Sequence, residues 1–469
     1  MHLAARLHAY LEQRGRPYVL IPHPPTQTLG EAAAAARIEP RQLARAVLLQ
    51  DADALRLAVL PASHLIDFQA IHQRTGHHYR PAAPQQVASV FSDCEPGSVP
   101  PLAEPYGLTA ILDAQLAGEE QIYFEAGCRD ALVSLPGAVF RSLHAASLVA
   151  DIARPLNVLE SRDLRDFMLP DEPQHPIPLA NLRPVRDIRA GFEQTKRLPP
   201  MPTMASRLLR LHASPSVTTG DLIEIIQADP GLTVQLLRYA RAGCFGFTGR
   251  LDTLPQAISQ VLGLDTALHM ALGLAASRTL RNPADGPLGL QAFWRHAAYS
   301  AALAQILATA SGPTAPLKPG LAYLAGLLHN FGFLLAGHLF RAEFFLLNRV
   351  VAANPQLPVS LIERRVLGVE HTELGASLMS AWQMPEAVTI VCREHHNAAY
   401  TGDQAGYVQL MYCVDLLLRG HGIGEGADAE VPAALLASLG LDPGQAQQLT
   451  IRLLESRDAL DAMARQLAS

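Results

Sequence analysis

Two regions of the chain carry residues that could do chemistry. In the first third, residues 95–101 (EPGSVPP) form a Gly- and Pro-rich phrase. Such a loop can bring backbone N–H groups close to a ligand carbonyl, where they stabilise a developing oxyanion. In the second half, His329 and Asn330 interrupt a long apolar stretch. Buried polar side chains are uncommon, so their presence in an apolar stretch indicates a buried helix that lines a site.

The cysteines do not suggest a site of their own. They are odd in number and scattered, and none forms a C-x-x-C pair, which argues against a disulfide framework or a thiolate zinc site: Cys94, Cys128, Cys244, Cys392 and Cys413. A reducing compartment fits this pattern. The N-terminal residues 1–16 contain Arg6, Glu12, Arg14 and Arg16 and do not resemble a signal peptide. We therefore expect a cytoplasmic location.

Charge and hydropathy exclude two further classes of protein. Residues 320–340 are long and apolar enough to pass for a membrane span. His329, Asn330 and His338 within them would be costly in lipid, so we interpret the stretch as a buried helix and expect no membrane association. The net charge of −6 gives no basic footprint for DNA, and any RNA contact has to be local.

The elements that must position these residues change type along the chain. In the first part, residues 46–49 and 55–60 predict a hairpin around a turn at residues 51–53, and Leu65, Phe68 and Ile71 follow at helical spacing. Residues 108–112 and 121–124 predict two more strands. These patterns predict an α+β domain with a mixed sheet over residues 1–148, followed by a proline-containing linker over residues 149–194.

The second part is predicted to be all helical. Leu222, Ile225 and Ile226 lie at helical spacing, and Asp229-Pro230 is typical of a helix cap with Pro at the first helical position. We place this all-α domain at residues 195–420 and a C-terminal helical extension at 421–469. The expected architecture is thus multidomain, with an α+β domain before an all-α domain.

The first domain resembles the YbaK/prolyl-tRNA-editing family, the aminoacyl-tRNA deacylases. The resemblance rests on the order of His23, Arg45 entering a strand, the loop at residues 97–101, a strand ending in Asp113, and Ala126-Gly127. It implies catalytic roles for Arg45, Gly97 and Pro101. It also implies ligand contacts by His23, Ser98 and Gly127, with an aminoacyl group or aminoacyl-tRNA as the ligand.

Arg45 stands where this family has a substrate-holding lysine. Its guanidinium is larger and planar and donates in a fixed fork, so we expect deacylation to be weakened. Two interpretations stay open. The chain has only two lysines, Lys196 and Lys318, so the change can be part of a general drift to arginine that activity tolerates. Alternatively, the domain has lost catalysis and still binds an aminoacyl or tRNA-like ligand.

The second domain resembles the HDOD domains, an atypical branch of the HD metal-phosphohydrolases. The matching phrases are DPGLT (229–233), LPQAI (254–258), FWRH (293–296), AGLLHNFG (325–332), HTELGA (371–376) and EHH (394–396). An active HD enzyme holds one or two cations with imidazole and carboxylate ligands from separate helices. The resemblance implies a divalent metal site formed by His296, His329, Asn330, His371, His395, His396 and Asp415.

Asn330 replaces the aspartate of the His-Asp pair in that family. A neutral amide cannot supply the anionic bridge between two cations, so we expect dinuclear binding to be weakened and phosphodiester hydrolysis to be lost. The Gly-Tyr-Pro signature of cyclic-di-GMP phosphodiesterases is also missing after His396. The histidines can therefore form either a residual metal site or a hydrogen-bonded polar pocket.

Together the two resemblances predict a bacterial regulatory protein of signal transduction. Its HDOD domain would act on an unidentified signalling protein, and its editing-like domain would recognise an aminoacyl ligand. The first alternative is an active trans-editing deacylase. The second is an HD-type metal-dependent phosphohydrolase, which Asn330 argues against.

Overall fold

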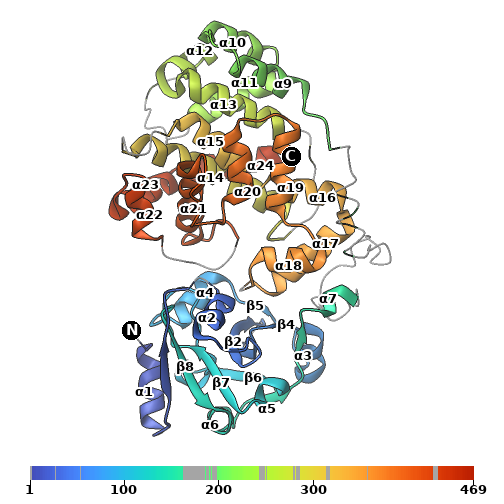
Figure 1. Cartoon of the computed structure of the whole chain (residues 1–469), viewed down its shortest axis with the longest axis vertical. Coiled ribbons are helices and arrows are strands. Elements are labelled where there is room, and N and C mark those ends of the chain that lie inside the picture. The colour runs from blue at the N-terminus through green and yellow to red at the C-terminus, as the bar shows by residue number, and fades with distance from the viewer. Residues whose placement is uncertain are drawn as a thin grey trace. The chain divides into compact units, whose positions relative to one another are not determined.

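The computed structural model describes residues 3–161, except 27 and 53, and residues 198–468, except 242–248, 250, 278, 279, 281–285, 313–316, 356 and 426–430, together with residues 185, 188, 190 and 192. Most of the predicted linker lies outside the described residues. The chain forms two compact units: the first contains Met1–Val185 and also Arg349–Val366, and the second contains Arg186–Asn348, Leu367–Glu425 and Glu430–Ser469 (Figure 1).

The first unit is built on a mixed sheet, as predicted. The strand order is β1-β8-β7-β2-β3-β6-β9, and β5 also pairs with β2. The β2–β7, β3–β6 and β6–β9 pairs are parallel and the other pairs are antiparallel. The strands of this sheet are β1 (Val19–Pro22), β2 (Leu43–Gln50), β3 (Leu55–Pro61), β5 (Arg80–Pro81), β6 (Thr109–Asp113), β7 (Gln121–Glu125), β8 (Ala131–Pro136) and β9 (Leu148–Ala150). A separate antiparallel pair is formed by β4 (His64–Ile66) and β10 (Ala153–Pro155).

Helices flank this sheet and short connections join them to it. They are α1 (Ala5–Gln13), α2 (Leu29–Ala36), α3 (Phe68–Thr75), α4 (Pro84–Val90), the short 3₁₀ helix η1 (Glu104–Tyr106), α5 (Ala114–Gly118), α6 (Gly137–Leu143) and α7 (Val158–Ser161). The predicted β2–β3 hairpin is confirmed, with Val47 opposite Ala58. The helix predicted to include Leu65 begins later, because Leu65 lies in β4 and the Asp67 side chain caps α3 at Phe68.

Alternation along β2 separates two cores. Ala44, Ala46 and Leu48 pack with α1 on one face of the sheet. Val47 and Leu49 face the opposite side and pack with Phe68 and Ile71 of α3. Ala353 is part of this second core and is fully buried, although it lies 200 positions after Ala153 of the same core. The Arg349–Val366 segment is thus a component of the first unit.

The second unit is helical, as predicted, and local signals mark the starts of its helices. Thr218 and Asp221 form a capping box, and Asp229 caps the helix that begins at Pro230. The helices are α9 (Thr203–His212), α10 (Thr219–Gln227), α11 (Pro230–Ala240), α12 (Leu254–Ala257), the π-helical turn η5 (Ile258–Leu262), α13 (Gly263–Ala276), α14 (Leu290–Ala310), α15 (Pro319–Leu328), α16 (Phe331–Leu339), α17 (Arg341–Ala353), which runs into the first unit, α18 (Val359–Val366), which belongs to it, α19 (His371–Ala381), α20 (Glu386–Glu394), α21 (Ala405–Arg419), α22 (Ala433–Ser438), α23 (Pro443–Glu455) and α24 (Arg457–Ala468).

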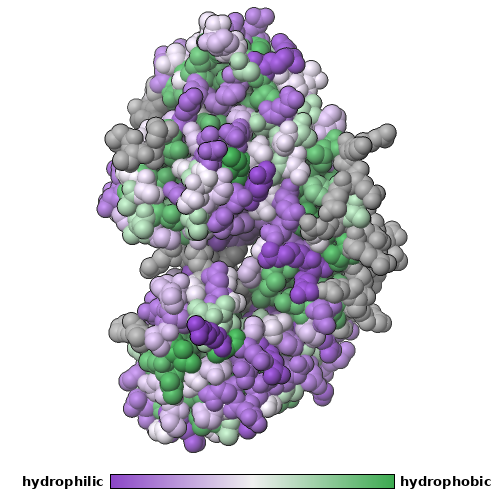
Figure 2. All heavy atoms as spheres, in the orientation of Figure 1, coloured by the Kyte–Doolittle hydropathy of each residue, from purple (hydrophilic) through white to green (hydrophobic). Residues whose placement is uncertain are grey.

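Two helical stretches are long and apolar enough to span a bilayer, Leu254–Ala276 and Pro319–Leu339. In the second of them, 94% of the tested window is buried inside the protein, as in a core helix. On the face drawn in Figure 2, hydrophilic residues are widespread and hydrophobic residues lie among them. Isolated exposed hydrophobics such as Val234 and Ile451 are normal on a protein surface.

Candidate functional site

Four helices of the second unit bring the predicted histidines together. His296 lies on α14, His329 follows α15, His371 opens α19, and His395 and His396 follow α20. Two glycines permit the close packing that this needs. A Cβ atom on Gly326 would lie 2.7 Å from the Ser300 carbonyl oxygen of α14, and one on Gly332 would lie 1.8 Å from the His371 carbonyl oxygen. Only glycine allows α15 to approach α14, and α16 to approach α19, so closely.

The first ligand group consists of His296, His329 and Asp415, from α14, the end of α15 and α21. All three are buried, and their ligand atoms lie within 4.8 Å of one another. The Asp415 Oδ1 atom lies 3.3 Å from His296 Nε2 and 3.6 Å from His329 Nε2. His329 Nδ1 donates to the Gly326 carbonyl at 2.8 Å, so its Nε2 presents a lone pair to the carboxylate side of the pocket.

Hydrogen bonding leaves this group unsatisfied. Among the residues that the structure describes, His296 Nε2, His329 Nε2 and both carboxylate oxygens of Asp415 are buried and form no hydrogen bond of normal geometry, and the two nitrogens lie at ion-pair distance from Asp415 Oδ1. Buried polar atoms are usually paired, and an unpaired cluster of nitrogen and oxygen donors is the kind of environment that a cation satisfies. The donor set therefore fits a divalent metal ion.

The second ligand group consists of His371, His395 and His396. His371 Nε2 lies 3.4 Å from His395 Nε2 and 3.1 Å from His396 Nε2. The His395 Nδ1 atom donates to the Val391 carbonyl at 3.0 Å, which turns its Nε2 toward His371. Stacking on Phe333, with ring centroids 4.0 Å apart, fixes the His371 ring.

The two groups are neighbours. The rings of His329 and His395, one from each group, are 5.0 Å apart between centroids. Six potential ligands, contributed by five helices or their ends, thus lie close together.

The protonation states in this interior suit a cation. Burial lowers the pKa of His329 to about 4, so the imidazole is neutral at neutral pH. Burial, together with the neighbouring histidines, holds the pKa of His395 well below its ordinary value. Burial acts to raise the pKa of Asp415, but His329 and His296 outweigh it and hold that pKa below its usual range. Neutral imidazoles around an ionised carboxylate are the forms that bind metal ions.

Asn330 lies at the edge of this interior, at the start of α16. Its amide nitrogen is 3.3 Å from His296 Nδ1 and donates to Glu425 Oε1, also at 3.3 Å. Glu425 was missed in the sequence analysis because it lies in a turn beyond α21, ten positions after Asp415, outside every matching phrase. A cavity of about 220 Å³ opens here and is lined by Phe293, His296, Asn330, Phe333 and Glu425, among others.

In the first unit, Arg45 is held by structural hydrogen bonds. Its side chain lies among the largest fully buried ones, with the residue 1% exposed. The Nη2 atom donates to the His64 carbonyl at 2.8 Å and to Asn354 Oδ1 at 3.0 Å. Burial lowers the Arg45 pKa to about 10, so the guanidinium stays charged at neutral pH.

Asn354 lies in the Arg349–Val366 segment of the first unit and is fully buried. Its Oδ1 atom also accepts from the Ile66 backbone N–H at 3.0 Å, and its Nδ2 atom donates to the Val350 carbonyl at 3.0 Å. One amide thereby pairs with the guanidinium, a strand N–H and a helix carbonyl. Arg45 is thus an anchor for this segment.

The other residues predicted for the editing site each have a structural contact. The Ser98 hydroxyl is buried and donates to Glu125 Oε1 at 3.3 Å. His23 Nδ1 donates to the Pro24 carbonyl at 2.8 Å. These contacts fix both side chains.

Backbone conformation accounts for the two glycines predicted there. Gly97 and Gly127 both have φ of +86°, a conformation that favours glycine. A Cβ atom on Gly127 would lie 2.5 Å from the Cβ of Ala4. Pro101 is buried. Ligand roles for all of these residues stay predictions.

Comparison with known proteins agrees with both resemblances. Residues 23–143 match the aminoacyl-tRNA editing domain family, and residues 198–398 match the HDOD domain family. The chain contains an editing domain and an HDOD domain. The five clustered histidines lie inside the HDOD match, whereas Asp415 and Glu425 follow its end at residue 398.

Solved structures are similar to the whole chain or to part of it. The crystal structure of a candidate signal transduction protein from Marinobacter aquaeolei VT8 is 27% identical, covers 100% of both chains and has a TM-score of 0.68. An HDOD domain protein from Geobacter sulfurreducens is 22% identical, with a TM-score of 0.49, over 60% of this chain and 97% of that one.

A sequence relative comes from Treponema pallidum (strain Nichols). This uncharacterized protein is 26% identical over 266 residues, which are 55% of this chain and 50% of the relative. The chain therefore spans about half the length of that relative.

Proposed function

We propose that this protein is regulatory and that its editing domain works by binding, without deacylase activity. The supporting observation is the state of Arg45. A substrate-holding cation has to be reachable by the substrate, whereas the Arg45 guanidinium is buried and hydrogen-bonded to His64 and Asn354. A fixed, planar fork that is already engaged by two acceptors is a poor replacement for a free ammonium group.

The same contact suggests how the domains are coupled. Residues 349–366 belong to the first unit, yet both of their chain neighbours, Asn348 and Leu367, belong to the second. Ligand binding elsewhere in the editing domain that disturbs the bond between Arg45 and Asn354 would loosen this segment. The HDOD domain would then pass the signal to a protein partner. Aminoacyl-tRNA or a smaller aminoacyl compound is the ligand class we propose.

The Marinobacter protein, a candidate signal transduction protein that matches this chain over the full length of both, supports a role in signalling. Hydrolysis by the HDOD domain is the weaker alternative, because Asn330 takes the place of a bridging carboxylate. Trans-editing deacylation remains the enzyme alternative.

A panel of mischarged tRNAs tests the proposal. We expect the full chain to bind members of the panel in filter-binding or anisotropy assays and to hydrolyse none of them above the buffer control. Arg45→Met is the matched variant. Hydrolysis by the wild type that disappears in Arg45→Met would show that the domain is an active deacylase and would overturn the proposal.

A further inference from the structure

The polar interior of the HDOD domain is short of negative charge. Among the described residues, its two ligand groups contain five histidines and a single carboxylate, Asp415. The affinity of such a site for divalent cations rises with the number of anionic ligands. Asn330 occupies the position next to His329 but contributes only a neutral amide.

Glu425 lies where that missing charge would be useful. Its Oε1 atom accepts from Asn330 Nδ2 at 3.3 Å, and Asn330 in turn lies 3.3 Å from His296 of the first group. Glu425 thus reaches the first group through the Asn330 amide.

The turn that carries Glu425 is shaped for a close approach. Gly422 and Gly424 both have positive φ, of 70° and 103°, which glycine adopts at little cost. A Cβ atom on Gly424 would lie 3.0 Å from His296 Nε2. The backbone next to Glu425 thus packs directly on a ligand of the first group, and both Glu425 and His296 line the 220 Å³ cavity.

We propose that Glu425 is a metal ligand and supplies the anionic oxygen that Asn330 cannot supply. The ligand class is a divalent first-row cation such as Mn²⁺, Co²⁺ or Zn²⁺, which imidazole and carboxylate donors bind together. The unpartnered nitrogens of His296 and His329 and both unpartnered oxygens of Asp415 point to the same conclusion. This proposal is independent of the proposed function, which rests on Arg45 in the other domain.

The alternative is that Glu425 only accepts the hydrogen bond from Asn330, in a pocket that binds no metal. The two roles differ in what Glu425→Gln would do. Glutamine keeps the size and a hydrogen-bond acceptor and removes only the charge. If Glu425 is a ligand, cation affinity falls; if it is only an acceptor, cation affinity is unchanged.

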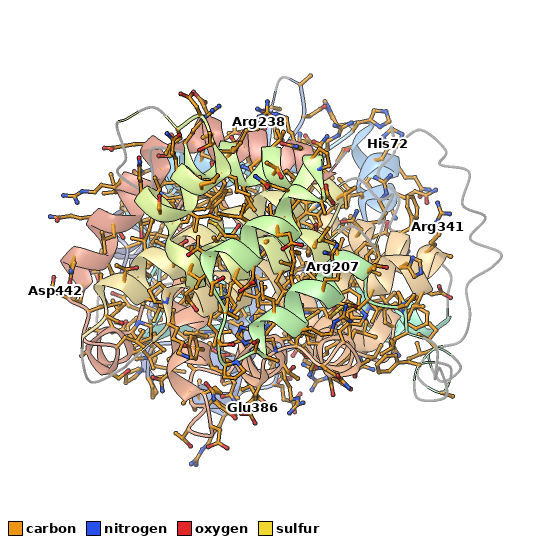
Figure 3. All side chains as sticks on the ribbon, turned by 90° about the horizontal axis from the view of Figure 1, so that it is seen from above. His72, Arg207, Arg238, Arg341, Glu386 and Asp442 are labelled. Atoms are coloured by element: carbon orange, nitrogen blue, oxygen red, sulfur yellow. The ribbon has the colours of Figure 1, made fainter. Side chains whose placement is uncertain are left out.

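The full chain is purified, stripped with a chelator and titrated with Mn²⁺ and Co²⁺. Bound metal is measured by mass spectrometry after dialysis, and the visible Co²⁺ spectrum reports the ligand set. We expect the wild type to bind metal and Glu425→Gln to bind at least about tenfold more weakly, with an altered Co²⁺ spectrum. Glu386→Gln is the matched control, because Glu386 begins α20 at the edge of the domain (Figure 3).

A second substitution keeps the result interpretable. In Glu425→Gln/Asn330→Asp, a carboxylate returns at the neighbouring position, and we expect affinity to recover toward the wild-type value. Circular dichroism establishes that each variant is folded. The proposal is overturned if the wild type binds no metal, or if Glu425→Gln binds as tightly as the wild type and Glu386→Gln.

Discussion

Asn354→Ala removes the acceptor that holds Arg45 in the first unit. Three hydrogen bonds are lost with it: those from Arg45 Nη2 and the Ile66 N–H to Oδ1, and the one from Nδ2 to the Val350 carbonyl. Both partners are at least 99% buried, so water cannot replace the lost acceptor. Breaking a buried charged hydrogen bond and leaving a strand N–H unsatisfied costs about 4 kcal/mol.

Arg45→Met gives the matched comparison. It removes the buried charge and leaves Asn354 bonded to Ile66 and Val350, so we expect a loss of about 1–2 kcal/mol. In the double variant no cation is stranded, and its loss should be smaller than the sum of the two single losses. Larger destabilisation by Arg45→Met than by Asn354→Ala would refute this ordering.

Hydrogen exchange of the Ile66 amide is the assay, because that N–H donates directly to Asn354. If the Ile66 amide exchanges through unfolding of the first unit, a loss of about 4 kcal/mol in the stability of that unit makes its exchange about a thousandfold faster. Asn397→Ala, a change of an exposed asparagine in the other unit, should leave Ile66 exchange unchanged. Unchanged exchange in Asn354→Ala would contradict the anchoring role of Asn354.

Two further predictions concern stability. Burial lowers the pKa of His144 to about 4. Since this pKa is below that of the unfolded chain, protonation of His144 favours unfolding. The free energy of unfolding should therefore fall by about 3 kcal/mol as the pH falls from about 6.5 toward 4. Melting curves of His144→Phe should therefore depend less on pH between 7 and 4.5, and equal dependence would count against the assignment. Gly332→Ala would place a Cβ 1.8 Å from the His371 carbonyl oxygen, so we expect a loss of about 3 kcal/mol or more in thermal unfolding and weaker Co²⁺ binding; a fully stable variant would contradict this packing.

Much of the fold could be predicted from local signals. Alternation in β2 and β3 and the turn between them predicted the hairpin, and Asp229-Pro230 predicted the start of α11. The helical spacing that begins at Leu65 gave the wrong start for the helix, because the Asp67 cap starts α3 at Phe68, three residues later. A cap formed by one side chain decides a helix boundary more strongly than the period of three apolar residues.

Long-range contacts could not be predicted in this way. Ala353 and Asn354 join the core of a domain that ends about two hundred positions earlier, and no periodicity around them shows it. The histidines could be assigned to one site from the sequence because each of them stands in a matching phrase. The structure places them in two neighbouring groups. Glu425 lies in a glycine turn outside those phrases, so only the three-dimensional structure places it beside Asn330.

Chemical modification of Arg45 tests most directly whether its guanidinium is available to a substrate. Phenylglyoxal reacts with accessible arginines, and peptide mass spectrometry reads each site separately. Arg41 is the internal control, since its side chain is 62% exposed in the same domain, whereas Arg45 is 1% exposed. We predict rapid modification of Arg41, none of Arg45 in the native chain, and modification of Arg45 in Asn354→Ala. Modification of Arg45 as fast as Arg41 in the wild type would contradict the proposal that the lysine position of the editing domain has become a buried anchor.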